Sequence, residues 1–156
     1  IFETREFFIN PDLTADPEIL GEEVSHYLHS EVNQMWKEGC SYRRFWERAI
    51  ILECVAHYGS LIYSKEKGLP FQKIRFLEVD HRIKSDIMQR EASHLLGYKR
   101  GDELFLRYGD SMLAKVARMS IDEANDQLPR IAPITFYEKK ILPLIDKLKQ
   151  IKNKKK

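Results

Sequence analysis

Two Glu-x-x-His motifs, Glu23 to His26 and Glu91 to His94, are the residues of this sequence whose types and spacing could support chemistry. The segment between them adds Glu53. Residues three apart lie on one side of a helix, so a carboxylate and an imidazole one turn apart can reach the same metal ions. Helical bundles that hold two iron or manganese ions use such motifs. One alternative function is therefore a helical-bundle di-iron or di-manganese carboxylate oxidase, with the ligands Glu23, His26, Glu53, Glu91 and His94.

The predicted helices position these residues only partly as a two-metal site requires. The apolar stripe of the first helix leaves Glu23 and His26 toward its flank or outer side. Glu91 and His94 fall on the apolar side of their helix. In two-metal bundles a helix with a plain Glu precedes each motif helix, and that order is missing here. The competing interpretation has Glu23 and His26 solvated and His94 partly buried and hydrogen-bonded, so our leading prediction includes no cofactor.

Other catalytic patterns are missing from the sequence. It contains neither a Gly-x-Ser-x-Gly nucleophile motif nor a glycine-rich phosphate-binding loop. Cys54 and His57 lie one helical turn apart, but a cysteine inside an apolar run is typical of a buried core residue. The sequence therefore favours a protein without catalytic activity over an enzyme.

Basic residues beside aromatic ones indicate a second alternative, an RNA-associated subunit of a ribonucleoprotein particle. Arg43 and Arg44 precede two aromatic residues, and the lysine-rich end of the chain includes Lys154 and Lys155. Arginine and aromatic side chains bind phosphates and stack on unpaired bases. The net charge is only +2, however, and lysines are also common at the end of a helix.

Aromatic residues near the start of the chain favour binding to protein partners. Aromatic side chains and arginine are the usual anchors of protein interfaces, although any one of them could equally lie in the core. The leading prediction is a non-catalytic structural or interaction subunit of a larger intracellular assembly. It would bind partners through a helical surface and terminal arms, with Phe7, Phe8, Trp36 and Arg44 as contact residues.

The cysteine content and the hydropathy pattern indicate where the protein works. The 2 cysteines form neither a disulfide framework nor a zinc motif, and no apolar run is long enough to span a membrane. We expect an intracellular, reducing compartment, either the cytoplasm or an organelle matrix such as that of mitochondria. Because the chain begins with Ile1, we expect a processed product or a piece of a longer protein.

Helical periodicity and capping signals divide most of the chain into helices. Pro17 suits a first helical turn, Gly39 and Gly97 are predicted helix ends, and Ser120 with Glu123 has capping-box spacing. We also expect a turn at 100–102 and one short extended segment near 72–79. The predicted helices are 17–38, 42–66, 81–96, 111–119, a helix from 120 that stops before Pro129, and 136–152.

These elements predict an all-α, single-domain, multi-helix bundle packed around the central apolar helix 42–66. Its apolar residues occur nearly all round the helix, which is typical of a helix covered on several sides. Residues 1–16 are expected to form an aromatic arm, 17–152 the helical domain and 153–156 a basic tail.

Overall fold

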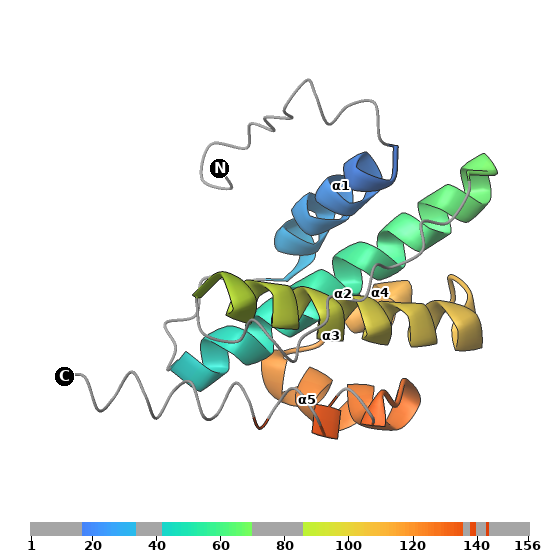
Figure 1. The fold of residues 1–156 in the computed structure, drawn as a ribbon. Coiled ribbons are helices and arrows are strands. Elements are labelled where there is room, and N and C mark those ends of the chain that lie inside the picture. Colours follow the sequence, from blue (N-terminus) through green and yellow to red (C-terminus); the bar gives the residue numbers. More distant parts are fainter. Residues whose placement is uncertain (1–16, 34–41, 70–85, 136–137, 140–142, 144–156) are drawn as a thin grey trace.

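The fold is an all-α bundle, as predicted (Figure 1). The computed structural model describes residues 17–33, 42–69, 86–135, 138–139 and 143, and within these ranges it contains helices and no strand. The predicted arm 1–16, the extended segment near 72–79 and the tail 153–156 lie outside the described residues, as does most of the helix predicted at 136–152. The helices are α1 Pro17–Val32, α2 Tyr42–Lys67, α3 Asp86–Tyr108, α4 Leu113–Ala117 and α5 Ile121–Ile131.

Helix α2 is the centre of the bundle, which confirms the prediction for 42–66. It contacts α1, α3, α4 and α5 (Figure 1). Gly68 follows its last residue with a φ of 65°, a left-handed conformation that glycine adopts without strain and that ends helices. Among the described residues, no helix is both long enough and apolar enough to cross a bilayer.

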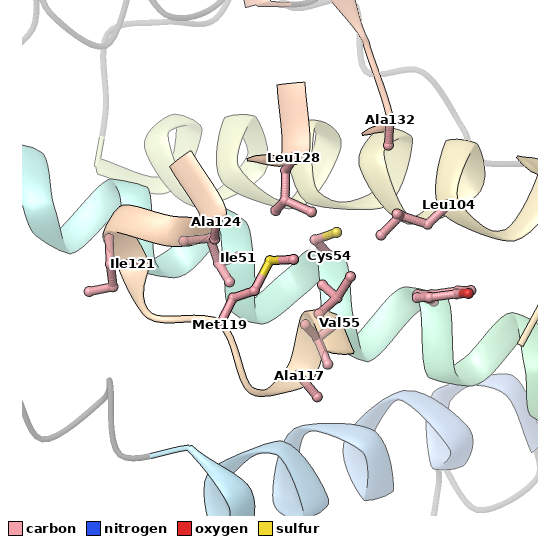
Figure 2. Packing of buried hydrophobic residues seen from close by; sticks show 12 residues of the cluster. Ile51, Cys54, Val55, Leu104, Ala117, Met119, Ile121, Ala124, Leu128 and Ala132 are labelled. Atoms are coloured by element: carbon pink, nitrogen blue, oxygen red, sulfur yellow. The ribbon is translucent and has the colours of Figure 1, made fainter. Parts of the chain in front are cut away.

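The main core lies between α2, α3 and the α4–α5 segment. Figure 2 shows its side chains converging from these elements. Each buried aliphatic or aromatic side chain contributes roughly 1.5–3 kcal/mol, so this cluster supplies most of the driving force for folding. Its fully buried members include Ile51, Cys54, Val55, Tyr58, Leu104, Val116, Ile121 and Ala124.

Helix α3 runs without interruption through Gly97 and Gly101, so the predicted helix end at Gly97 and the turn at 100–102 are wrong. Both glycines face α2. A Cβ added at Gly97 would lie 2.5 Å from the Cβ of Glu53 and 2.9 Å from the backbone oxygen of Ile50. A Cβ at Gly101 would lie 3.0 Å from the backbone oxygen of Cys54. These glycines therefore serve close helix packing, not helix termination.

The predicted start of α5 is confirmed, but its predicted end is wrong. Ser120 accepts a hydrogen bond from the Glu123 backbone, and the Glu123 side chain accepts one from the Ser120 backbone. The helix continues past Pro129 to Ile131. Pro129 lacks the N–H that would bond to the Asn125 oxygen, so the helix loses one backbone hydrogen bond, but carbonyls at the end of α5 gain a donor from α3. The buried guanidinium of Arg100 donates to the oxygens of Leu128 and Ala132.

Helix α1 packs on α2 with its small and polar residues, not with its apolar stripe. Val24, Leu28 and Val32 are 39%, 57% and 47% exposed. On the side of α1 that contacts α2, Ser25 lies so near Gly59 that a Cβ at Gly59 would be 2.3 Å from the Ser25 hydroxyl oxygen. Helix α1 therefore presents a polar face to the interior and an apolar face outward, which its periodicity does not predict.

Candidate metal centre

The carboxylate of Glu53, on α2, lies between two imidazoles from the neighbouring helices. Its Oε2 is 3.7 Å from Nε2 of His26 on α1 and 3.5 Å from Nε2 of His94 on α3. The side chains of Glu53 and His26 are 15% and 17% exposed, whereas that of His94 is 45% exposed. Two of the five predicted metal ligands, His26 and His94, thus approach the carboxylate of a third, Glu53, and the expectation of a solvated His26 is wrong.

The second carboxylate at this point belongs to Glu22 and not to Glu23. One ligand atom each of Glu22, His26 and Glu53 lies within 4.8 Å of the other two. Glu23 is exposed, as the solvated interpretation predicted, and the side chain of Glu91 lies outside the described residues. The sequence signal for Glu22 is its spacing of four from His26, which places both on the polar side of α1. The Glu-x-x-His motif has a spacing of three, so it does not include Glu22.

A hydrogen-bonded and aromatic layer of α2 and α3 side chains surrounds these residues. Tyr98 donates its hydroxyl hydrogen to Oε1 of Glu22. Its ring stacks on that of His57 with centroids 4.5 Å apart. His57 in turn has its Nε2 2.9 Å from Oδ1 of Asp102. Sequence reasoning identified neither Tyr98 nor Asp102, because their relevance depends on the crossing of α3 over α2.

The ionisation of the cluster is set by burial and by opposite charges. Burial raises the pKa of Glu22, although the hydrogen bond from Tyr98 opposes that effect. Burial by itself lowers the pKa of His26, but the nearby carboxylate of Glu53, followed by the charge of Glu22, raises it overall. His26 therefore binds a proton more readily than a free imidazole, and a cation bound at this site would compete with that proton.

The spacing of the ligand atoms suits coordination better than direct hydrogen bonding. Contacts of 3.5 and 3.7 Å are longer than an ordinary hydrogen bond of about 2.7–3.2 Å between nitrogen and oxygen. Two ligands held about 2.1 Å from a tetrahedral zinc ion are about 3.4 Å apart. The buried Oε2 of Glu53 also has no hydrogen-bond partner in the part of the chain that the structure describes. The geometry of Glu53 therefore fits a metal ligand.

The remaining predicted site residues are not brought to this cluster. Arg44 joins α2 to α5 through an ion pair in which its Nη1 is 2.5 Å from Oδ1 of Asp122. This ion pair does not test the prediction that Arg44 contacts a partner, because both side chains remain partly exposed. The other predicted contacts to protein or RNA lie outside the described side chains, namely Phe7, Phe8, Trp36, Arg43, Lys154 and Lys155.

Cys54 is a core residue, as its sequence context predicts. The thiol is fully buried, and burial raises its pKa to about 12. A thiol with this pKa stays protonated at neutral pH and is a poor nucleophile. The proximity of Cys54 to His57 in the sequence therefore does not make a catalytic pair.

Comparison of the chain with protein-family models, with curated protein sequences and with solved structures finds no match. The class that the fold and site define is thus an all-α bundle with a histidine–carboxylate cluster between α1 and α2, and His94 of α3 lies beside its Glu53.

Proposed function

We propose that this protein binds one divalent transition-metal ion between α1, α2 and α3. Glu22, His26 and Glu53 are the proposed ligands, and His94 is the fourth. The observation that carries the proposal is the placement of the buried Glu53 Oε2, 3.7 and 3.5 Å from two imidazole nitrogens. Two imidazoles with two carboxylates suit zinc, iron(II) or manganese(II).

A single ion fits the described residues better than the two ions of a carboxylate oxidase. A two-metal site needs bridging carboxylates on several helices. Of the carboxylates predicted for that role, Glu23 is exposed and Glu53 already lies between two histidines. We therefore propose a site for one metal ion, not the two-metal site of a di-iron or di-manganese oxidase, and we assign no reaction to it.

A bound ion would fasten α1 to the rest of the bundle. Leu28 and its apolar neighbours on α1 point outward, so the docking of α1 gains little from apolar burial. The proposed ligands come from α1, α2 and α3, and each coordination bond would join α1 to the other two helices. Because ligands are brought together only in the folded chain, binding free energy would add to folding free energy.

The test is metal analysis of the native protein, followed by calorimetric titration of the metal-free protein with zinc, manganese(II) and, without oxygen, iron(II). We expect about one tightly bound ion per chain. Glu53→Gln keeps the shape of the side chain but removes its charge, and the loss of a ligand should weaken binding by at least roughly 10–100-fold. Glu103→Gln is the matched control, because Glu103 is on α3 and pairs with Arg107 at 3.0 Å. Equal affinities of the wild type and Glu53→Gln would overturn the proposal.

The exposed stripe of α1 favours a second candidate function, binding of a partner protein. Val24, Leu28 and Val32 are spaced by four and form one exposed apolar strip, and the exposed Glu23 and Glu31 lie to one side of it. This pattern is complementary to an amphipathic helix with basic residues beside its apolar face. An interaction subunit thus remains our second proposal, with the apolar strip of α1 as its contact surface.

This second candidate is tested on the native complex, purified and identified by mass spectrometry. Leu28→Lys should abolish co-purification of a stoichiometric partner, because it places a charge in the apolar strip. Leu106→Lys is the control, since Leu106 is an isolated exposed residue of α3. Equal recovery of the partner with both variants would exclude the α1 stripe. The RNA-associated alternative gains no support from Arg44, which contacts Asp122.

A further inference from the structure

Tyr98 of α3 touches two of the proposed ligands in different ways. Its hydroxyl group donates to Oε1 of Glu22. The rings of Tyr98 and His94 form an edge-to-face contact, with centroids 5.8 Å apart and an interplanar angle of 84°. Tyr98 is therefore in contact with the cluster from the α3 side, although a tyrosine in this position is not itself a proposed ligand.

The ring of Tyr98 packs against His57 of α2, which Asp102 of α3 holds in place. It stacks on His57 with an interplanar angle of 19°. His57 is buried, and its Nε2 lies 2.9 Å from Oδ1 of Asp102. Gly101 leaves room for the imidazole, because a Cβ there would lie 3.0 Å from Cδ2 of His57. Oδ2 of Asp102 is also 3.6 Å from Nζ of Lys99, which holds the carboxylate on its own helix.

We infer that Tyr98 is a positioning residue of the metal site, which orients the carboxylate of Glu22 toward the ion through its hydroxyl group. This inference rests on the proposed function. With Oε1 engaged by Tyr98, the direction of Oε2 is set for coordination. Partners of this kind hold metal ligands in place, and their removal typically weakens binding by 10–100-fold. Asp102 and His57 do not contact the ion in this arrangement, and they act by fixing the ring of Tyr98.

The test uses cobalt(II) as the probe, because its visible absorption reports the geometry of its ligands and its affinity can be measured against a chelator of known strength. Tyr98→Phe keeps the ring and its stacking but removes the hydroxyl group. We expect cobalt binding about 10–100-fold weaker than in the wild type, with a changed visible spectrum. Tyr108→Phe is the matched control on the same helix, since the Tyr108 hydroxyl donates to the Ile131 oxygen at 3.1 Å, away from the cluster. It should leave both readouts unchanged.

A double-mutant comparison decides whether Tyr98 acts through Glu22. In a Glu22→Ala background the hydroxyl group has lost its acceptor, so Tyr98→Phe should cause no further loss of affinity. Additive losses, or a Tyr98→Phe variant with the affinity and spectrum of the wild type, would overturn the inference. Failure of the wild type to bind cobalt would instead overturn the proposed function.

A third variant keeps the inference testable should Tyr98→Phe not fold. Asp102→Asn leaves Tyr98 in place, removes the charge beside His57 and also removes the ion pair of Asp102 with Lys99. Weaker cobalt binding by this variant, with an unchanged helical circular dichroism spectrum, supports the positioning chain from Asp102 to Glu22. Unchanged binding contradicts it.

Discussion

Gly97 of α3 lies directly against Glu53 of α2, where a Cβ at position 97 would be 2.5 Å from the Cβ of Glu53. The same added atom would be 2.9 Å from the backbone nitrogen of Cys54. The absent side chain thus brings α3 close to α2 at the residue on which the candidate site is centred. Close packing and the positions of the proposed ligands therefore depend on one another.

Gly97→Ala should destabilise the protein and weaken metal binding. Alanine in a helix interior normally gains about 1 kcal/mol over glycine. Here the added methyl group would meet backbone atoms that cannot rotate away, so we expect a net loss of about 1–3 kcal/mol in the free energy of unfolding, measured by urea denaturation. Gly21→Ala is the control, because its nearest contact would be the side chain of Tyr63, at 3.2 Å. Equal stabilities of the two variants would contradict this account.

Removal of metal should loosen α1 before it loosens α2. A ligand at 100 times its dissociation constant adds about 2.7 kcal/mol to the free energy of unfolding. Addition of zinc at that excess to the metal-free protein should give this increase, and should slow amide hydrogen exchange most within Pro17–Val32. Glu53→Gln should show neither effect. Protection that rises equally along α1 and α2 would show that the ion does not act through docking of α1.

His29 should make the metal-free protein less stable in acid. Its imidazole is buried on α1, and neither ring nitrogen has a hydrogen-bond partner among the described residues. Burial, helped by the charge of His26, lowers the pKa of His29 to about 4. Between about pH 6.5 and pH 4 the unfolded chain therefore binds a proton at this residue that the folded protein does not, so stability falls as the pH falls.

The size of this effect can be isolated by substitution. A pKa difference of about 2.5 corresponds to a loss of about 3 kcal/mol in the free energy of unfolding. This loss is complete below pH 4. His29→Leu removes the titrating group and should lose that much less stability between pH 6.5 and pH 4, as measured by urea denaturation in the presence of a chelator. Parallel pH profiles of the wild type and His29→Leu would show that His29 titrates normally in the folded state.

Arg100→Leu should be strongly destabilising, because the buried guanidinium serves α5 and the segment after it. Arg100 donates to the oxygen of Ala132 and forms an ion pair with Glu138. Removal of one partner of such a buried pair costs roughly 3–5 kcal/mol, since the other groups stay buried without a partner. Arg130→Leu is the control, because its pair with Asp126 is exposed and should contribute less than about 1 kcal/mol. Similar midpoints of chemical unfolding for the two variants would contradict the role of Arg100.

The sequence determined that the fold is all-α and which helix is central, but not where α3 and α5 end. The apolar residues around α2 predicted its position, and the capping box of Ser120 and Glu123 predicted the start of α5. These signals are local, because they depend on residues a few positions apart, so they can be interpreted without knowing what packs against them. The sequence also identified His26, Glu53 and His94 as residues that could meet.

Only the tertiary structure decided which faces of the helices are inside. Gly97 is equally compatible with a helix end and with a close helix contact, and the neighbouring α2 settles that choice. The periodicity of α1 predicted that its apolar stripe faces inward, but the glycine and serine side of α1 approaches α2 more closely. That rotation brings Glu22 to the cluster in place of Glu23. The orientation of a helix depends on the shape of the surface it meets, and that surface is formed by residues far away in the sequence.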